Sequence, residues 1–315
     1  MAGGADFNGG VTQDGKALLD DPVNTALGVR LHSHAADGLT YAQLLGRRFH
    51  DHRGQSTLAS VGVLVETAIA GTVYAALPGG RRSVAASLTV NAAQPLPDAD
   101  EVVAQGRSRH VDLQAGTGLA SGVVRDSAGA VCATVSARGV VVERPVDHSG
   151  ATAPVQDLDV EAGPGVQTGP SGDELAERLG LDVVQAIAFG DIPRGPLADL
   201  LGLEVRLVRT GSVTGVFTPQ EWMANSMGTL QGGVLLAVAD QVCGLAAETA
   251  TDPGERYRVL DLRTDFVRSP EVSGPDIRFE ADVVRAGRRI ELVEARISTD
   301  RGRLLTTAWA SVQRY

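Results

Sequence analysis

Cysteine and basic residues are both scarce in this sequence of 315 residues, and each shortage excludes a class of protein. The two cysteines, Cys132 and Cys243, lie far apart inside apolar segments, which is typical of buried thiols in a reducing compartment and not of a disulfide framework. Lys and Arg total 28 against 38 Asp and Glu, a formal net charge of -10. A nucleic-acid partner needs a dominant basic face, so we expect none.

Targeting and membrane segments are also missing from the pattern. The opening residues, MAGGADFNGG, have neither the basic start nor the apolar core of a signal peptide. We expect no apolar run to approach the ~18 residues that a membrane span needs. These features predict a cytoplasmic protein with no membrane partner, and the length suffices for two ordinary domains.

A fixed offset of 174 residues relates the two halves of the chain. Pro22 in DPVNTALG recurs as Pro196 in GPLADLLG, and the apolar segment LASVGVLVETAIAG aligns with GGVLLAVADQVCGL. The same shift sets Glu66 opposite Asp240. Because a constant offset persists over about 100 residues, we interpret the chain as two copies of one unit.

Domain boundaries follow from the repeat and from composition. Residues 146–172 are rich in Pro, Gly, Ala, Asp and Ser without periodicity, which is typical of a linker. We therefore predict an N-terminal unit over 1–145 and a C-terminal unit over 173–315, the second with the better-preserved motif. Helical spacing over 173–189 predicts a helix leading into the second unit.

The second copy shows the expected secondary structure most clearly. Two strands at 201–208 and 212–219 precede a glycine-rich loop and an apolar helix from Gly232 to Thr249, and four strands follow at 259–267, 276–286, 289–299 and 304–313. The stretch IRFEADV alternates apolar and polar residues, the period-2 pattern of a sheet with one solvated face. The simplest packing is an α+β fold in which an antiparallel sheet wraps one long buried helix.

The stretch NSMGTLQGGVLLAVAD resembles the PaaI-like acyl-CoA thioesterases of the hotdog superfamily. Their motif has Asn, Gly, a His-Gly-Gly and then an Asp on the central helix, and its places are taken here by Asn225, Gly228, Gly232, Gly233 and Asp240. Two places differ: Gln231 replaces the His, and Val259 stands where a Ser or Thr is usual. The resemblance implies two tandem hotdog units and acyl-CoA hydrolysis, with coenzyme A as part of the substrate and no other cofactor or metal.

Distance along the helix predicts how the site is assembled. Gly232 and Asp240 are separated by about 12 Å at ~1.5 Å per residue, too far to share one carbonyl. The resemblance implies two antiparallel helices whose loops and carboxylates meet across copies. Site one then joins Asn225, Gln231 and Gly232 to Glu66, and Gly233 is a candidate contact for the thioester. Site two joins Asp240 to Asp51, Thr57 and Leu58.

The candidate residues have expected catalytic roles, and each also has a purely structural alternative. The helix N-terminus at Gly232 would bind the oxyanion, Glu66 would activate water or attack directly, and Asn225 would position the reactants. Site two lacks the glycine pair and is expected to be weaker or structural. Alternatively, Glu66 and Asp240 are buried carboxylates satisfied by a backbone N–H or an Arg, and the glycines only allow tight packing.

Other patterns leave several possibilities open. Two His-x-His pairs, in LHSHAAD and FHDHRG, fit a polar exposed edge better than a metal site. The arginine pairs Arg47–Arg48, Arg81–Arg82 and Arg288–Arg289 could hold coenzyme A phosphates but fit a solvated face. A hydratase or dehydratase and a non-catalytic acyl-CoA-binding protein are the rival functions. We expect a homo-oligomer, a dimer of double hotdogs.

Overall fold

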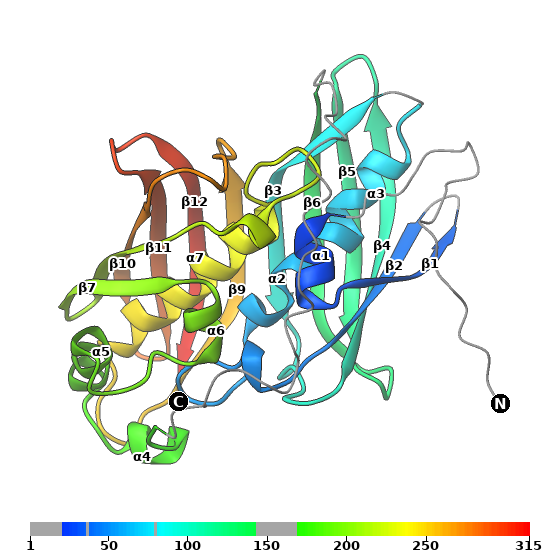
Figure 1. Cartoon of the computed structure of the whole chain (residues 1–315). Helices are drawn as coiled ribbons and strands as arrows, with labels where there is room; N and C mark the ends of the chain where they lie inside the picture. Colours follow the sequence, from blue (N-terminus) through cyan, green and yellow to red (C-terminus); the bar gives the residue numbers. More distant parts are fainter. Residues whose placement is uncertain (1–20, 36–37, 79–80, 143–168) are drawn as a thin grey trace.

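One antiparallel sheet runs through the whole protein. The computed structural model describes residues 21–35, 38–78, 81–142 and 169–315. Its twelve strands form a single sheet that curves around two sets of central helices, which lie side by side in Figure 1. Most of the predicted linker, 146–172, lies outside the described residues, and the boundaries 1–145 and 173–315 remain predictions.

The strands repeat in the two halves. The ends of each strand in the first half agree, within two residues, with those of a strand 174 positions later. All of the strands predicted in the second copy are present. The first half contains β1 (Arg30–Ala35), β2 (Gly38–Leu44), β3 (Arg82–Ala92), β4 (Glu101–Asp112), β5 (Thr117–Arg125) and β6 (Val131–Val142). The second half contains β7 (Leu203–Arg209), β8 (Ser212–Phe217), β9 (Tyr257–Phe266), β10 (Ile277–Ala286), β11 (Ile290–Thr299) and β12 (Leu304–Arg314).

Strand order reveals an internal two-fold relationship. The sheet runs β1-β2-β4-β5-β6-β3 and continues β9-β12-β11-β10-β8-β7, so the second half repeats the first in mirror order. The halves join where β3 pairs with β9 antiparallel, from Ser87 opposite Asp265 to Asn91 opposite Asp261. Two copies that would otherwise each expose a sheet edge are thereby sealed into one surface.

The central helices differ between the halves. α7 (Gly232–Glu248) is one continuous α-helix and is buried along nearly its whole length. Its counterpart is divided into η2 (Leu58–Val61), α2 (Gly62–Val65), the π-helical segment η3 (Glu66–Ala70) and α3 (Gly71–Ala75). The π segment begins at Glu66, and such segments are frequent at functional sites.

The two central helices cross at a pair of glycines. A side-chain carbon on Gly62 would lie 2.5 Å from the Gly233 carbonyl oxygen, and one on Gly233 would lie 2.4 Å from the Gly62 carbonyl oxygen. Any larger residue would force the helices apart. Close packing therefore accounts for Gly233, as the alternative interpretation of the glycine pair expects.

The helix predicted over 173–189 is wrong as a single helix. It forms α4 (Gly172–Ala176) and α5 (Gly180–Phe189), separated at Leu179, whose backbone is extended. A side-chain carbon on Gly180 would lie 1.8 Å from the Glu248 carbonyl oxygen, so the chain turns here to dock on the end of α7. Two other short helices, α1 (Pro22–Leu27) and α6 (Pro196–Leu200), are counterparts under the offset.

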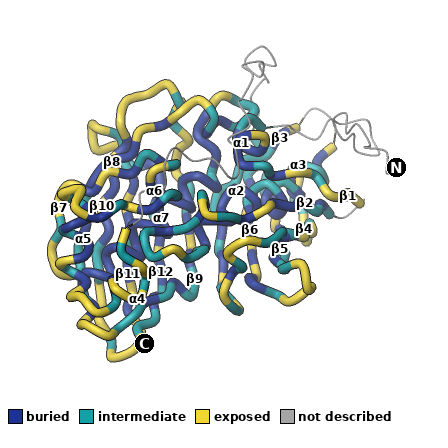
Figure 2. The backbone as a smooth tube through the Cα atoms, turned by 60° about the horizontal axis from the view of Figure 1, so that its bottom comes forward, coloured by how far each residue is buried: buried dark blue, intermediate teal, exposed yellow. Residues whose placement is uncertain are grey.

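Burial shows where the core lies. In Figure 2 the inner strands and central helices are dark blue, whereas the outer loops are yellow. Both cysteines are free and buried, as predicted. The window Leu58–Ala75 is long and apolar enough to cross a membrane, which corrects the expectation from the sequence. Its one charged residue is Glu66. Because 72% of this window is buried inside the fold, it is a core helix here.

Candidate functional site

Two cavities lie where the halves meet, and their linings correspond under the 174-residue offset. Glu66, Asn225 and Gln231 line the first cavity, and their counterparts Asp240, Asp51 and Thr57 line the second. The first cavity encloses about 100 Å³ and the second about 630 Å³. Each cavity is therefore lined by a carboxylate from one half and a loop from the other.

In site one, Glu66 meets the loop at the start of α7. The Gln231 side chain donates a hydrogen bond from Nε2 to Glu66 Oε2, and its Oε1 accepts one from the Gly233 N–H at 2.7 Å. Gln231 is 1% exposed. Because its oxygen caps the helix, its NH₂ group must point at Glu66, and the amide has one orientation. At the place where the motif has a His, this chain therefore has a neutral amide that donates a hydrogen bond to Glu66.

Gly232 lies against the same carboxylate. A side-chain carbon there would be 3.6 Å from Glu66 Cγ and 3.3 Å from Phe266 Cζ. Gly232 is the first residue of α7, so its N–H has no partner within the helix and carries partial positive charge. A carbonyl oxygen could approach this N–H only because the residue is glycine. Glu66 and an oxyanion-type donor therefore face one space.

Charge and burial tune Glu66. Burial, with a smaller contribution from the nearby Asp21 carboxylate, raises the pKa of Glu66 to about 8. Asp21 also lines this cavity, and its Oδ1 accepts a hydrogen bond from the Ser226 N–H at 2.7 Å. At neutral pH most Glu66 side chains are therefore protonated, and the ionised form is a strong base when it forms.

Asn225 holds its own loop. Its Oδ1 accepts hydrogen bonds from the N–H groups of Met227 at 2.9 Å and Thr229 at 3.2 Å, and from the Thr229 hydroxyl at 3.2 Å. These contacts shape the tight turn that includes Gly228, whose φ is +73°. The amide nitrogen remains as the group with which Asn225 could reach a ligand in the cavity it lines.

In site two, Asp240 lies against the start of the opposite helix. Its Oδ2 accepts a hydrogen bond from the Ala59 N–H at 3.0 Å, whereas Oδ1 is buried without a partner among the described residues. Burial raises the pKa of Asp240 to about 6, against the opposing effect of hydrogen bonds from Thr57 and Ala59. Leu58 replaces Gly232 here, and its side chain is buried beside the helix start. The backbone N–H expected by the alternative interpretation is present.

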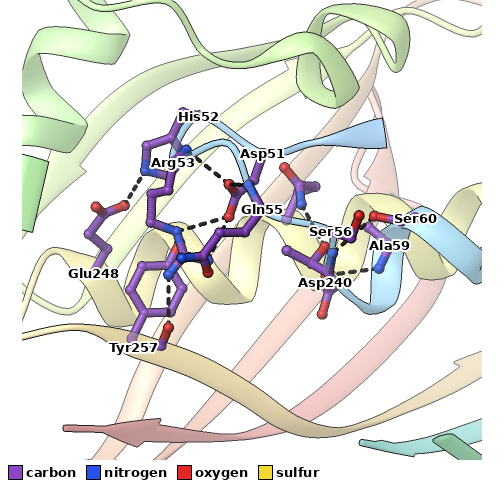
Figure 3. A network of polar contacts seen from close by, with 12 residues as sticks. Asp51, His52, Arg53, Gln55, Ser56, Ala59, Ser60, Asp240, Glu248 and Tyr257 are labelled. Carbon is purple, nitrogen blue, oxygen red and sulfur yellow. Dashed lines mark hydrogen bonds and ion pairs between the residues drawn. The ribbon is translucent and has the colours of Figure 1, made fainter. Parts of the chain in front are cut away.

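Site two also carries a group of buried ion pairs, shown in Figure 3. Arg53 donates to Asp51 at 2.6 Å and to the Tyr257 carbonyl at 2.8 Å, and its guanidinium stacks on the Tyr257 ring at 3.7 Å. His52 pairs with Glu248 at 2.8 Å. Asp51 has the place of Asn225, and its Oδ1 accepts the equivalent loop N–H groups. Its carboxylate is thus engaged in holding the loop.

Several sequence interpretations change once the side chains are placed. His52 is buried and ion-paired, so the second His-x-His pair is not an exposed edge, whereas His32 and His34 are exposed on β1 as expected. Arg82 is buried close to the Tyr74 ring, so it is not part of a solvated face. Over the part of the chain that the structure describes, no group of three His, Cys, Asp or Glu side chains is arranged to hold a metal.

Four residues of site one were not found from the sequence: Asp21, Asn24, Thr67 and Phe266. Each comes from outside the motif: Asp21, Thr67 and Phe266 line the cavity, and Asn24 accepts a hydrogen bond from Thr67. Comparing the two copies could have singled out Asp21 and Asn24. DPVN at 21–24 aligns with GPLA at 195–198, and both polar residues are absent from the second copy. Neither Val259 nor its counterpart Ala85 supplies a hydroxyl to its cavity; Thr67 supplies one to site one.

One known protein family matches part of the sequence. Residues 227–306 match the thioesterase superfamily, and this segment includes α7 with Asp240, strands β9, β10 and β11, and the start of β12. This part of the second unit is therefore similar to the thioesterase superfamily. No curated protein matches the sequence.

Solved structures are similar in fold over nearly the whole chain. The tesB protein of Mycobacterium avium subspecies paratuberculosis is 11% identical, covers 93% of this chain and 98% of its own, and has a TM-score of 0.57. A hot dog fold protein from Alicyclobacillus acidocaldarius is 13% identical over 93% and 97%, also with a TM-score of 0.57. Acyl-CoA thioesterase II TesB2 from Mycobacterium marinum is 12% identical over 93% and 96%, with a TM-score of 0.56. The predicted double-hotdog fold is confirmed.

Proposed function

We propose that the protein hydrolyses an acyl-CoA thioester to a free acid and coenzyme A, and that site one carries the reaction. The observation that supports this most directly is the meeting of Glu66 with Gln231 and Gly232 across the two halves. A carboxylate and an unpaired helix N–H on one cavity are the groups that thioester hydrolysis needs. Similarity to the thioesterase superfamily over 227–306 supports the same reaction class.

The reaction follows from the position of each group. The thioester oxygen accepts a hydrogen bond from the Gly232 N–H, which stabilises the oxyanion as the carbonyl carbon is attacked. Ionised Glu66 removes a proton from water as the water oxygen attacks, or attacks directly to form an anhydride that water then cleaves. The carbon–sulfur bond breaks and coenzyme A leaves as its thiolate, which takes up a proton. Asn225 positions the reactants through its amide nitrogen, and Gln231 holds the carboxylate.

Site two has the weaker role in this proposal. Asp240 could serve as its base, but Leu58 crowds the helix start where site one has glycine, and Asp51 is occupied by Arg53. No cofactor beyond the coenzyme A of the substrate is required. The cytoplasmic location and a dimer of double hotdogs remain part of the proposal.

A non-catalytic acyl-CoA-binding protein is the second candidate. It is favoured by one observation: at neutral pH most Glu66 side chains are protonated, since burial raises the pKa of Glu66 to about 8. A protonated acid can hold a ligand as a hydrogen-bond donor but cannot act as a base.

The test is release of coenzyme A from a panel of short, long and aryl acyl-CoAs, followed by a thiol reagent. We expect turnover with at least one of them, increasing toward pH 9. Tight binding of these thioesters without thiol release at any pH from 6 to 9 would favour the binding protein. A hydratase would instead change the acyl chain and leave the thioester intact.

A further inference from the structure

A chain of polar side chains links α1 to the carboxylate of site one. Thr67 donates its hydroxyl hydrogen to Asn24 Oδ1 at 2.9 Å. Gln231 Nε2 lies 3.4 Å from the Thr67 hydroxyl oxygen and also donates to Glu66 Oε2. Asn24 is 2% exposed, so this chain is closed to bulk water at its far end.

The chain has one consistent donor direction. The Gly233 N–H requires the oxygen of Gln231, so the Gln231 NH₂ group faces Glu66 and Thr67. Thr67 can accept from that group only with its lone pairs, and its single hydrogen then goes to Asn24. Asn24 thereby fixes the direction in which the Thr67 hydroxyl points. Without an acceptor at position 24, the hydroxyl hydrogen would be free to turn toward the cavity.

α1 also holds the opposing loop of the second half. Asp21 accepts from the Ser226 N–H at 2.7 Å, and the Val23 N–H donates to the Ala224 carbonyl at 3.3 Å. The short helix therefore contacts both partners of the site, the loop that carries Asn225 and the helix that carries Glu66. Displacement of α1 would change the distance between them.

The counterpart in site two lacks this acceptor. Gln241 has the place of Thr67 and Thr57 has that of Gln231, and Gln241 donates to the Thr57 hydroxyl oxygen at 3.2 Å. Ala198, which has no polar side-chain atom, takes the place of Asn24. Site two therefore has an amide where site one has the Thr67 hydroxyl, and no side-chain acceptor where site one has Asn24.

We propose that Asn24 is a positioning residue of site one, acting through Thr67 and Gln231 on the Glu66 carboxylate. This proposal rests on the proposed function for its kinetic consequences. Glu66 ionises next to a fixed N–H donor, and a donor that faces the ionised form favours it. The other titratable side chains lining the cavity are Asp21, Tyr41 and Tyr74, and none of them is replaced in the test.

The kinetic test compares Asn24→Leu and Thr67→Val with Thr67→Ser. Loss of one held hydrogen bond is expected to lower kcat about tenfold with little change in KM, and the serine variant is expected to recover most of it. Thr218→Val is the matched control, because it removes a 2.8 Å hydroxyl bond to Asp276 far from both cavities. Unchanged kcat in Asn24→Leu and Thr67→Val would overturn the proposal.

A second readout does not depend on activity. Titration of the Glu66 carboxyl by ¹³C NMR, assigned with Glu66→Gln, is expected to show a midpoint higher than wild type in Asn24→Leu and Thr67→Val, restored in Thr67→Ser. The same midpoint in all folded variants would overturn the positioning role, even if the protein hydrolyses no acyl-CoA. Shifted midpoints with no turnover by wild type would support the positioning role and reject the proposed function.

Discussion

The two cavities are built from equivalent elements of the two halves but differ in their side chains. Site one is small and places a glycine at the helix start. Site two is larger and carries Arg53 against Asp51 and His52 against Glu248, with Leu58 at the helix start. These ion pairs hold the loop of site two, which supports the proposal that this site is the weaker one or structural. The comparison teaches that the two halves keep the same strand order while the side chains of each cavity differ.

The largest expected effect is on kcat, and it distinguishes Glu66 from Asp240. Glu66→Gln removes the proposed base of site one, and kcat is expected to fall by about 10²–10⁴-fold. Asp240→Asn is the matched change in site two and is expected to lower kcat much less. Initial rates of coenzyme A release from the best substrate measure both. Equal losses in the two variants would show that the cavities work alike.

A second variant gives site one the residue that site two has. Gly232→Leu places side-chain atoms close to Phe266 and Glu66, where a carbon would already lie 3.3 Å and 3.6 Å away. Carbonyl access to the helix N–H is lost, so kcat is expected to fall by about 10²–10³-fold. The melting temperature, followed by circular dichroism, checks that the fold persists. A folded variant with wild-type kcat would remove Gly232 from the mechanism.

The pH dependence of the free energy of unfolding is expected to distinguish Glu66 from Asp240. The pKa of Glu66, about 8 when folded, is above its ordinary 4.5, so the fold favours the neutral form. Its stabilising contribution is complete below pH 4.5 and is lost as pH rises through 8, on the order of 3 kcal/mol between pH 5 and 8. Glu66→Gln is expected to lose this decline in the free energy of unfolding measured with urea. For Asp240 the corresponding window ends near pH 6.

The smallest expected effect is a displacement of the pH–rate profile. A general base must be ionised, so kcat/KM is expected to rise with pH to a plateau above the pKa of the base. With Glu66 as the base the midpoint lies near 8, and with Asp240 it would lie near 6. Measurements from pH 5 to 9 with one acyl-CoA decide between them, and a midpoint near 6 would transfer the reaction to site two.

The sequence predicts the fold because the fold depends on local, periodic signals, whereas the pairing of loop and carboxylate across the copies came from the family resemblance. The offset of 174, the alternation in β10 and the glycines before α7 are properties of neighbouring residues, and each is found in the structure. The rule that Gly232 lies too far from Asp240 in its own helix required only the helical rise.

Other features could not be predicted from the sequence because they depend on contacts between residues that are far apart in the chain. The bond from Gln231 to Glu66, the burial of His52 against Glu248 and the break at Gly180 each involve a partner more than 60 residues away. The π-helical turn at Glu66 has no distinctive composition, since its apolar neighbours fit an ordinary helix equally well. Side-chain packing across the halves decides such details, and no window of sequence contains both partners.

The covalent joining of the two copies has an evolutionary meaning. In a pair of identical subunits every substitution alters both reaction centres at once, so neither can specialise without harming the other. Here the strand pairing of β3 with β9 keeps the copies together while each has its own coding sequence. The second cavity has Leu58 and the ion-paired Asp51 where the first has Gly232 and the amide of Asn225.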